Sequence, residues 1–412
     1  MYQNLAILAA FLLDYRVIAG RVARCWISGP IVFCAAGMAL GPGGAGLLRV
    51  NIGAEGLRLL AEATLAMVLF TDAAHADLGV IRRSIGLPER LLLIGLPLTI
   101  VLGAAIAWVL FPALRLPEVA LLATMLAPTD AALGKPVVAS PAVPAAIRES
   151  LNFESGLNDG ICVPVIVILL GVAVGTQIEH QPLAHVTLVV AEEIGIGLVI
   201  GLALAALGAR TFDAASARAW SSPAWRDVEP VALAAACFAL AQALGGSGFI
   251  ACFVGGLVFG ALARGDRHAM LRGAEATGEA LALLTWLIFG SEVVAAVLPS
   301  VGVAAFVYAV LSLTLIRMAP VFLALRGTGL VAREALFIGW FGPRGLASIV
   351  FAIMVRDAGL PGNATLMAAT GCAVVLSVAA HGVSANPLIR ALFVAPAQRA
   401  PPPGGAGETL GR

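Results

Sequence analysis

Two pairs of oxygen-bearing side chains interrupt an otherwise apolar stretch at 147–174. Glu154 and Asn158 lie four residues apart, and Ser155 and Asp159 repeat that spacing one position later. On a helix this spacing places each pair on one face. Carboxylate, hydroxyl and amide oxygens are hard ligands that suit small cations. A carboxylate in the middle of an apolar span is costly to bury and therefore indicates a functional site.

Two further polar segments stand inside apolar stretches. In the first segment, 127–131, Pro128 precedes Thr129 and Asp130, so the helix expected over 117–138 should break there and restart at a capping residue. The second segment, 339–345, contains Gly342, Pro343 and Arg344, and it predicts another break near the middle of its span. We expect Arg344 to neutralise Glu154, which would leave a net negative site at Asp159.

The composition excludes a soluble enzyme. Of the 412 residues, 60% are hydrophobic and only 12% are charged, whereas soluble domains carry roughly 25% charged residues. The net charge of +1 gives no electrostatic reason to expect nucleic acid as a partner. We therefore predict an all-α polytopic membrane protein whose surroundings are the lipid bilayer of the cell membrane.

Thirteen stretches have the length and apolar character of membrane-spanning helices, which need about 20 residues each. Residues 1–394 form one transmembrane unit, and the Pro/Gly-rich segment 395–412 is predicted to be a disordered cytoplasmic tail. The predicted spans are 3–19, 28–44, 55–74, 90–112, 117–138, 147–174, 184–209, 228–245, 247–263, 276–298, 301–325, 332–355 and 363–388.

Arginine is concentrated in alternate loops, and this bias predicts the orientation. Most of the basic residues fall on the inner side if the N-terminus is outside and the C-terminus inside. Lys135 lies near the inner end of span five, where it can extend to the interface. The segments then assigned to the outside carry only four arginines, Arg49, Arg58, Arg115 and Arg356.

A weak internal repeat relates the two halves of the chain. Ser28, Gly29 and Ile31 in span two match Ser247, Gly248 and Ile250 in span nine, followed by glycines at the same spacing. The offset is seven spans, so spans 1–6 and 8–13 would be inverted-topology repeats. Broken, crossing spans 5 and 12 would then face each other, as in many secondary transporters.

These motifs resemble the monovalent cation:proton antiporters, in particular the electroneutral, NhaP-like sodium/proton exchangers. The resemblance rests on the run Glu-Ser-Gly-Leu-Asn-Asp-Gly at 154–160, Thr-Asp at 129–130, Gly-Pro-Arg-Gly at 342–345 and Gly-Gly-Ser-Gly-Phe at 245–249. This sequence departs from the family pattern at Ala131, where a proline often follows the Thr-Asp pair.

The resemblance implies a role for each matching residue. Asp159 would bind either a cation or a proton, with Asp130, Thr129 and Ser155 supplying further oxygens for Na⁺. Glu154 and Asn158 would be held by Arg317 and Arg344. The resemblance also implies a homodimer, a core domain of spans 4–6 and 11–13 that moves in an elevator-like manner, and a dimerisation domain from the remaining spans.

The predicted function is electroneutral exchange of Na⁺ or Li⁺ for H⁺, in which both compete for Asp159. Asn158 stands where electrogenic relatives carry a second aspartate, and this favours one-for-one exchange. No cofactor is expected, because the substrates are the ions themselves. Other acidic residues, among them Glu62 and Asp72, could line a path to the site. A K⁺/H⁺ antiporter, a cation channel and an intramembrane enzyme remain alternatives.

Overall fold

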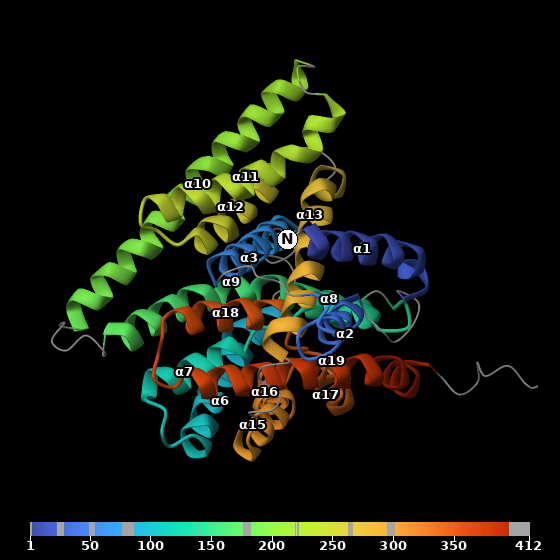
Figure 1. The fold of residues 1–412 in the computed structure, drawn as a ribbon, viewed down its shortest axis with the longest axis vertical. Helices are drawn as coiled ribbons and strands as arrows, with labels where there is room; N and C mark the ends of the chain where they lie inside the picture. Colours follow the sequence, from blue (N-terminus) through green and yellow to red (C-terminus); the bar gives the residue numbers. More distant parts are fainter. Residues whose placement is uncertain are drawn as a thin grey trace, which may run out of the picture.

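The computed structural model describes residues 2–22, 29–48, 54–75, 86–138, 140–175, 183–218, 220, 222–262, 267–294 and 301–394. Within these ranges the regular structure is helical, with no strand (Figure 1). The first half contains α1 (Tyr2–Val22), α2 (Gly29–Leu40), α3 (Ala54–His75), α5 (Leu87–Arg90), the π-helical turn η1 (Leu91–Gly95), α6 (Leu96–Leu110), α7 (Leu116–Met125), α8 (Ala131–Val138) and α9 (Ala145–Gly175).

The second half contains α10 (Leu183–Ala217), α11 (Pro223–Ala243), α12 (Gly248–Leu262), α13 (Arg267–Ile288) and the π-helical turn η2 (Phe289–Val294). It ends with α15 (Val303–Leu313), α16 (Leu315–Ala324), α17 (Ala332–Trp340), α18 (Leu346–Asp357) and α19 (Asn363–Phe393). Within the described residues each of the thirteen predicted ranges contains helix, and two of them are interrupted by a break. Five helical stretches are long and apolar enough to cross a membrane by themselves. The total number of crossings stays a prediction.

Both predicted helix breaks are confirmed. The first separates α7 from α8 at residues 126–130, and the second separates α17 from α18 at 341–345. Proline lacks an N–H and disfavours helix at the preceding residue, which explains both positions. The two breaks meet, because the Asp130 amide donates a hydrogen bond to the Pro343 carbonyl at 2.8 Å.

Close glycine contacts pack α2 on α13 and η2, and α12 on α3. A side chain at Gly37 would strike the Leu287 carbonyl, and one at Gly256 would strike the Phe70 carbonyl. Small residues allow such close backbone approach between membrane helices. Each of the two helices that carry the repeated motif, α2 and α12, thus packs closely on a helix of the other half of the chain, and the repeat itself stays a prediction. The inverted topology of the halves and the N-out, C-in orientation stay predictions.

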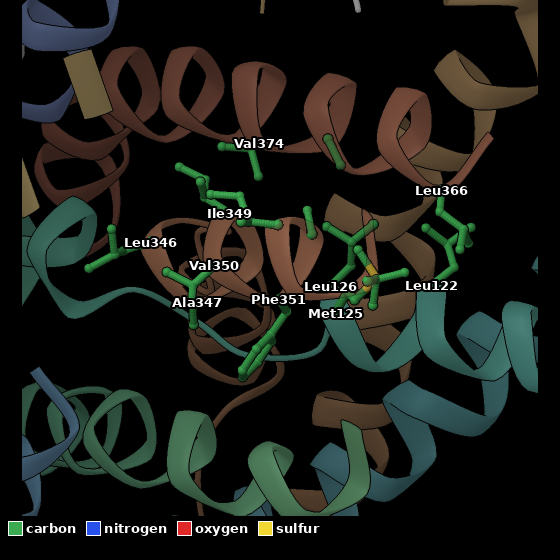
Figure 2. Close-up of a cluster of buried hydrophobic side chains, with 14 of the residues drawn as sticks. Leu122, Met125, Leu126, Leu346, Ala347, Ile349, Val350, Phe351, Leu366 and Val374 are labelled. Atoms are coloured by element: carbon green, nitrogen blue, oxygen red, sulfur yellow. The ribbon is translucent and has the colours of Figure 1, made fainter. Parts of the chain in front are cut away.

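An apolar cluster joins α7, α18 and α19 next to the two breaks. Figure 2 shows leucine and methionine side chains of α7 next to α18, with α19 running alongside both helices. The cluster is buried, so these three helices pack together next to the non-helical segments 126–130 and 341–345. Its labelled members are Leu122, Met125, Leu126, Leu346, Ala347, Ile349, Val350, Phe351, Leu366 and Val374.

A second apolar cluster lies between α3, α10, α11, α12 and α13; Figure 1 shows α10, α11 and α12 on the side away from α6, α7 and α15, with α3 and α13 toward the middle. The proposed division into a core domain and a dimerisation domain stays a prediction. The predicted disordered tail, 395–412, lies outside the described residues.

Candidate functional site

A buried ion pair joins α9 to α16. Arg317 Nη1 lies 2.6 Å from Glu154 Oε1, and Arg317 Nη2 donates a hydrogen bond to Glu154 Oε2 at 2.7 Å. Both side chains are 1% exposed. The guanidinium contacts both carboxylate oxygens, one through a hydrogen bond and the other through an ionic contact. The charge of Glu154 is therefore neutralised by Arg317.

The expectation that Arg344 neutralises Glu154 is wrong. Arg344 Nη1 donates hydrogen bonds to the carbonyls of Ala127 at 2.8 Å and Pro128 at 3.2 Å, and its Nη2 donates to the Ser312 carbonyl at 3.3 Å. The last carbonyls of a helix lack intrahelical partners and carry partial negative charge. Arg344 thus binds two carbonyls of the first break, just after α7, and caps the last turn of α15.

Asp130 caps two helices at once. Its Oδ1 accepts a hydrogen bond from the Leu133 amide at 3.3 Å, in the first turn of α8. Its Oδ2 accepts one from the Leu346 amide at 2.9 Å, at the start of α18. Both helix N-termini carry partial positive charge that stabilises a nearby carboxylate. Asp130 is therefore held in the middle of the two breaks by backbone amides of both helices.

Polar side chains of α9 contact the first break directly. The hydroxyls of Thr129 and Ser155 lie 2.9 Å apart, and Asn158 Nδ2 donates a hydrogen bond to Thr129 Oγ1 at 2.7 Å. The resemblance implied that an arginine would hold Asn158, but its hydrogen-bond partner in the structure is Thr129. The structure brings the predicted residues Thr129, Ser155 and Asn158 together.

Asp159 occupies the same turns of α9 and is 7% exposed. Among the described residues, its Oδ1 and the Oδ1 of Asn158 have no hydrogen-bond partner. Buried oxygens are nearly always paired, and an unpaired one calls for an explanation such as an ion. The two oxygens are therefore candidate cation ligands.

Asp72 joins the site from α3, a role that the sequence did not single out among several intramembrane acids. A side chain at Gly156 would lie 3.7 Å from the Asp72 Cβ, so Asp72 faces the polar turn of α9. Asp72 interacts electrostatically with Asp159 and Asp130. Its signal in the sequence is an acid inside apolar span three. The side chain of Lys135 lies outside the described part of the structure.

Gly345 offers a direct test of how tightly Asp130 is held. A methyl group at this position would overlap the Asp130 carboxylate, which is fixed by two backbone amides. We expect Gly345→Ala to displace Asp130 and to reduce cation-dependent proton transport by about 10- to 100-fold, as loss of supporting contacts does at metal sites. Gly302→Ala, where nothing lies within 4 Å, is the control. Wild-type transport by Gly345→Ala would contradict this prediction.

Comparison with known proteins gives the family. The model of the sodium/hydrogen exchanger transmembrane family matches residues 7–391. The chain is 27% identical over 392 residues to the K(+)/H(+) antiporter NhaP of Alkalimonas amylolytica, an alignment covering 94% of this chain and 67% of that protein.

The fold is similar to solved structures of the sodium proton antiporter MjNhaP1 from Methanocaldococcus jannaschii. The structure at pH 8 has a TM-score of 0.74 and 18% identity, and covers 93% of this chain and 99% of that chain. An electron-microscopy structure has a TM-score of 0.74 and 21% identity, and covers 95% and 98%.

The family match spans nearly all of the described helices, including both breaks and the acidic turn of α9. The family consists of transporters, not enzymes. The chain belongs to the sodium/hydrogen exchanger family of membrane proteins, and it is an antiporter that exchanges monovalent cations for protons.

Proposed function

We propose that this antiporter exchanges Na⁺ or Li⁺ for H⁺ at Asp159, with Asp130, Thr129 and Ser155 completing the cation site. The observation that carries the proposal is the pair of unpartnered buried oxygens, Asn158 Oδ1 and Asp159 Oδ1. Both oxygens belong to α9, the helix whose residues Ser155 and Asn158 contact Thr129. Hard oxygen ligands of this kind suit small alkali cations.

The surrounding charges favour one-for-one exchange. Arg317 compensates Glu154, and two helix N-termini stabilise Asp130. Among the described residues Asp159 has no ion-pair partner, so one proton or one monovalent cation neutralises its carboxylate, while Asp72 and Asp130 lie beside it in both loaded forms. A site in which Asp159 is neutralised crosses an apolar barrier more readily than the same site with Asp159 charged. One monovalent cation would therefore cross in one direction for each proton that crosses in the other, so no net charge would move and the exchange would be electroneutral.

The proposed movement is elevator-like. The core domain (predicted spans 4–6 and 11–13) would carry the site past a dimerisation domain made of the remaining helices. The joined breaks and the apolar cluster of α7, α18 and α19 support this, because they tie the site residues into one firm body. We further propose a homodimer in the cell membrane with the N-terminus outside.

K⁺ is the second candidate substrate, because the relative from Alkalimonas amylolytica is named as a K⁺/H⁺ antiporter. The ligand chemistry is the same for both ions. Discrimination between Na⁺ and K⁺ rests on the size and rigidity of the oxygen cage.

The test is proton flux in proteoliposomes that hold a pH-sensitive dye under an imposed proton gradient. We expect Na⁺ or Li⁺ to dissipate the gradient, with no effect of a voltage clamp by valinomycin and K⁺. Because the proton competes for the same carboxylate, a tenfold rise in proton concentration should raise the apparent KM for the cation about tenfold in the competitive range. A response to K⁺ alone would change the substrate, and a rate that follows the voltage would contradict electroneutral exchange.

A further inference from the structure

A polar stripe runs along one face of the otherwise apolar helix α19. Ser377, His381 and Ser384 are spaced by four and three residues, so they lie on one side of the helix. Ser377 and His381 are 0% and 2% exposed. The stripe faces the second break, and it has no part in the cation site described above.

The stripe holds both ends of that break. The Arg344 amide donates a hydrogen bond to Ser377 Oγ at 2.6 Å, and His381 Nε2 lies 2.7 Å from the Trp340 carbonyl oxygen. His381 Nδ1 also lies 2.8 Å from the Ser377 carbonyl oxygen, so the imidazole ring bridges carbonyls of α19 and α17. One helical turn of α19 therefore contacts the last carbonyl of α17, which also accepts a hydrogen bond from the Gly342 amide at 2.8 Å, and binds a backbone amide just before α18.

Trp340 strengthens this attachment. Its indole ring stacks on the His381 imidazole with 5.1 Å between ring centroids, and its Nε1 donates a hydrogen bond to Ser384 Oγ at 2.9 Å. The imidazole is thus fixed in orientation by stacking, by the Trp340 carbonyl and by a contact of 3.2 Å between its Nδ1 and Ser377 Oγ.

The held segment is the one that positions Asp130. The Pro343 carbonyl accepts the Asp130 amide hydrogen bond, and the Leu346 amide donates to the Asp130 carboxylate. Arg344 in the same segment caps the other break through Ala127 and Pro128. Displacing the segment would therefore displace Asp130 and the backbone next to Thr129.

We propose that Ser377 and His381 are positioning residues for cation binding, acting through the 341–345 segment on Asp130. We call this pair the α19 clamp. The inference rests on the proposed function in one respect, the place of Asp130 in the cation site. Buried supporting hydrogen bonds of this kind orient the direct ligands of an ion and set its affinity.

The test compares His381→Leu with His381→Gln in proteoliposomes. Leucine removes the ring nitrogen that contacts the Trp340 carbonyl, whereas the glutamine amide retains an N–H at a similar reach. We expect His381→Leu to raise the apparent KM for the transported cation about tenfold or more, with a smaller change in maximal rate. His381→Gln should stay close to wild type. Ser377→Ala is the second variant, with a KM increase in the same direction.

Thr285→Val is the matched control. It removes a buried hydrogen bond between α3 and α13, where the Thr64 and Thr285 hydroxyls lie 3.0 Å apart, without touching either break. It should lower the melting temperature and leave KM unchanged. An unchanged KM in both His381→Leu and Ser377→Ala, or an equal rise in Thr285→Val, would overturn the clamp.

Hydrogen exchange separates failure of the clamp from failure of the proposed function. In detergent, the amides of Arg344 and Leu346 should exchange faster in His381→Leu than in wild type, whatever ion is transported. Wild-type protein that moves no Na⁺, Li⁺ or K⁺ against protons would contradict the proposed function only. Unchanged exchange in the variant would contradict the clamp itself.

Discussion

Asp159→Asn is expected to abolish cation-dependent proton transport while the protein still folds. Asparagine keeps the size of the side chain, but it neither binds a proton nor neutralises a cation. Loss of a supporting contact already costs about 10- to 100-fold at ion sites, so loss of the central carboxylate should cost about 100-fold or more. Transport is measured as dissipation of a proton gradient by Na⁺, Li⁺ or K⁺ in proteoliposomes.

Two controls make this prediction sharp. Asp357→Asn removes a carboxylate that pairs with its neighbour Arg356 at 3.0 Å near the end of α18, and it should transport like wild type. The melting temperature of Asp159→Asn should not fall below that of wild type, because a buried carboxylate without an ion-pair partner costs free energy. Full transport by folded Asp159→Asn would refute the central role of this residue.

Glu154→Gln is expected to destabilise the protein strongly. The substitution leaves Arg317 buried with an uncompensated charge, and breaking a buried ion pair costs about 3–5 kcal/mol. The measurement is the melting temperature in detergent, together with the yield of monodisperse protein. Replacing both partners with apolar residues, Glu154→Met with Arg317→Met, should recover much of the lost stability, because neither charge is then left unpaired.

The matched control is a partly exposed ion pair of the same type. Arg58 Nε lies 2.7 Å from Glu62 Oε1, and the arginine side chain is 51% exposed. The Glu62 side chain is 10% exposed, but solvent at the arginine screens the pair, so Arg58→Ala should lower the melting temperature less than Glu154→Gln does. If Glu154→Gln melted like Arg58→Ala, the buried pair would not stabilise the fold as proposed.

The breaks could be predicted from the sequence, because their causes are local, whereas the proximity of Thr129 to Ser155 was implied only by the family resemblance. Proline and glycine act on the adjacent backbone, and a spacing of four residues fixes a face of a helix. The partner of Glu154 could not be predicted. Arg317 and Arg344 both lie deep in apolar spans, and only the packing of α16 on α9 decides which one reaches the carboxylate.

The roles of Asp72 and His381 could not be predicted either, because both depend on how helices pack against each other. An acid in span three is equally compatible with a helix end and with the site until α3 is placed against α9. Histidine is uncommon in such an apolar helix, and its spacing with Ser377 and Ser384 is a signal that the sequence does contain. Its partner is a backbone carbonyl of α17, which no residue pattern identifies.

The two buried arginines also bear on how the protein is made. Glu154 and the carbonyls of Ala127 and Pro128 are synthesised long before Arg317 and Arg344, which neutralise or cap them. A chain halted between these segments would hold an unpaired carboxylate and bare carbonyls at the level of the hydrocarbon, where both are costly. We therefore expect the first half of the chain to become fully stable in the bilayer only once the second half has been inserted.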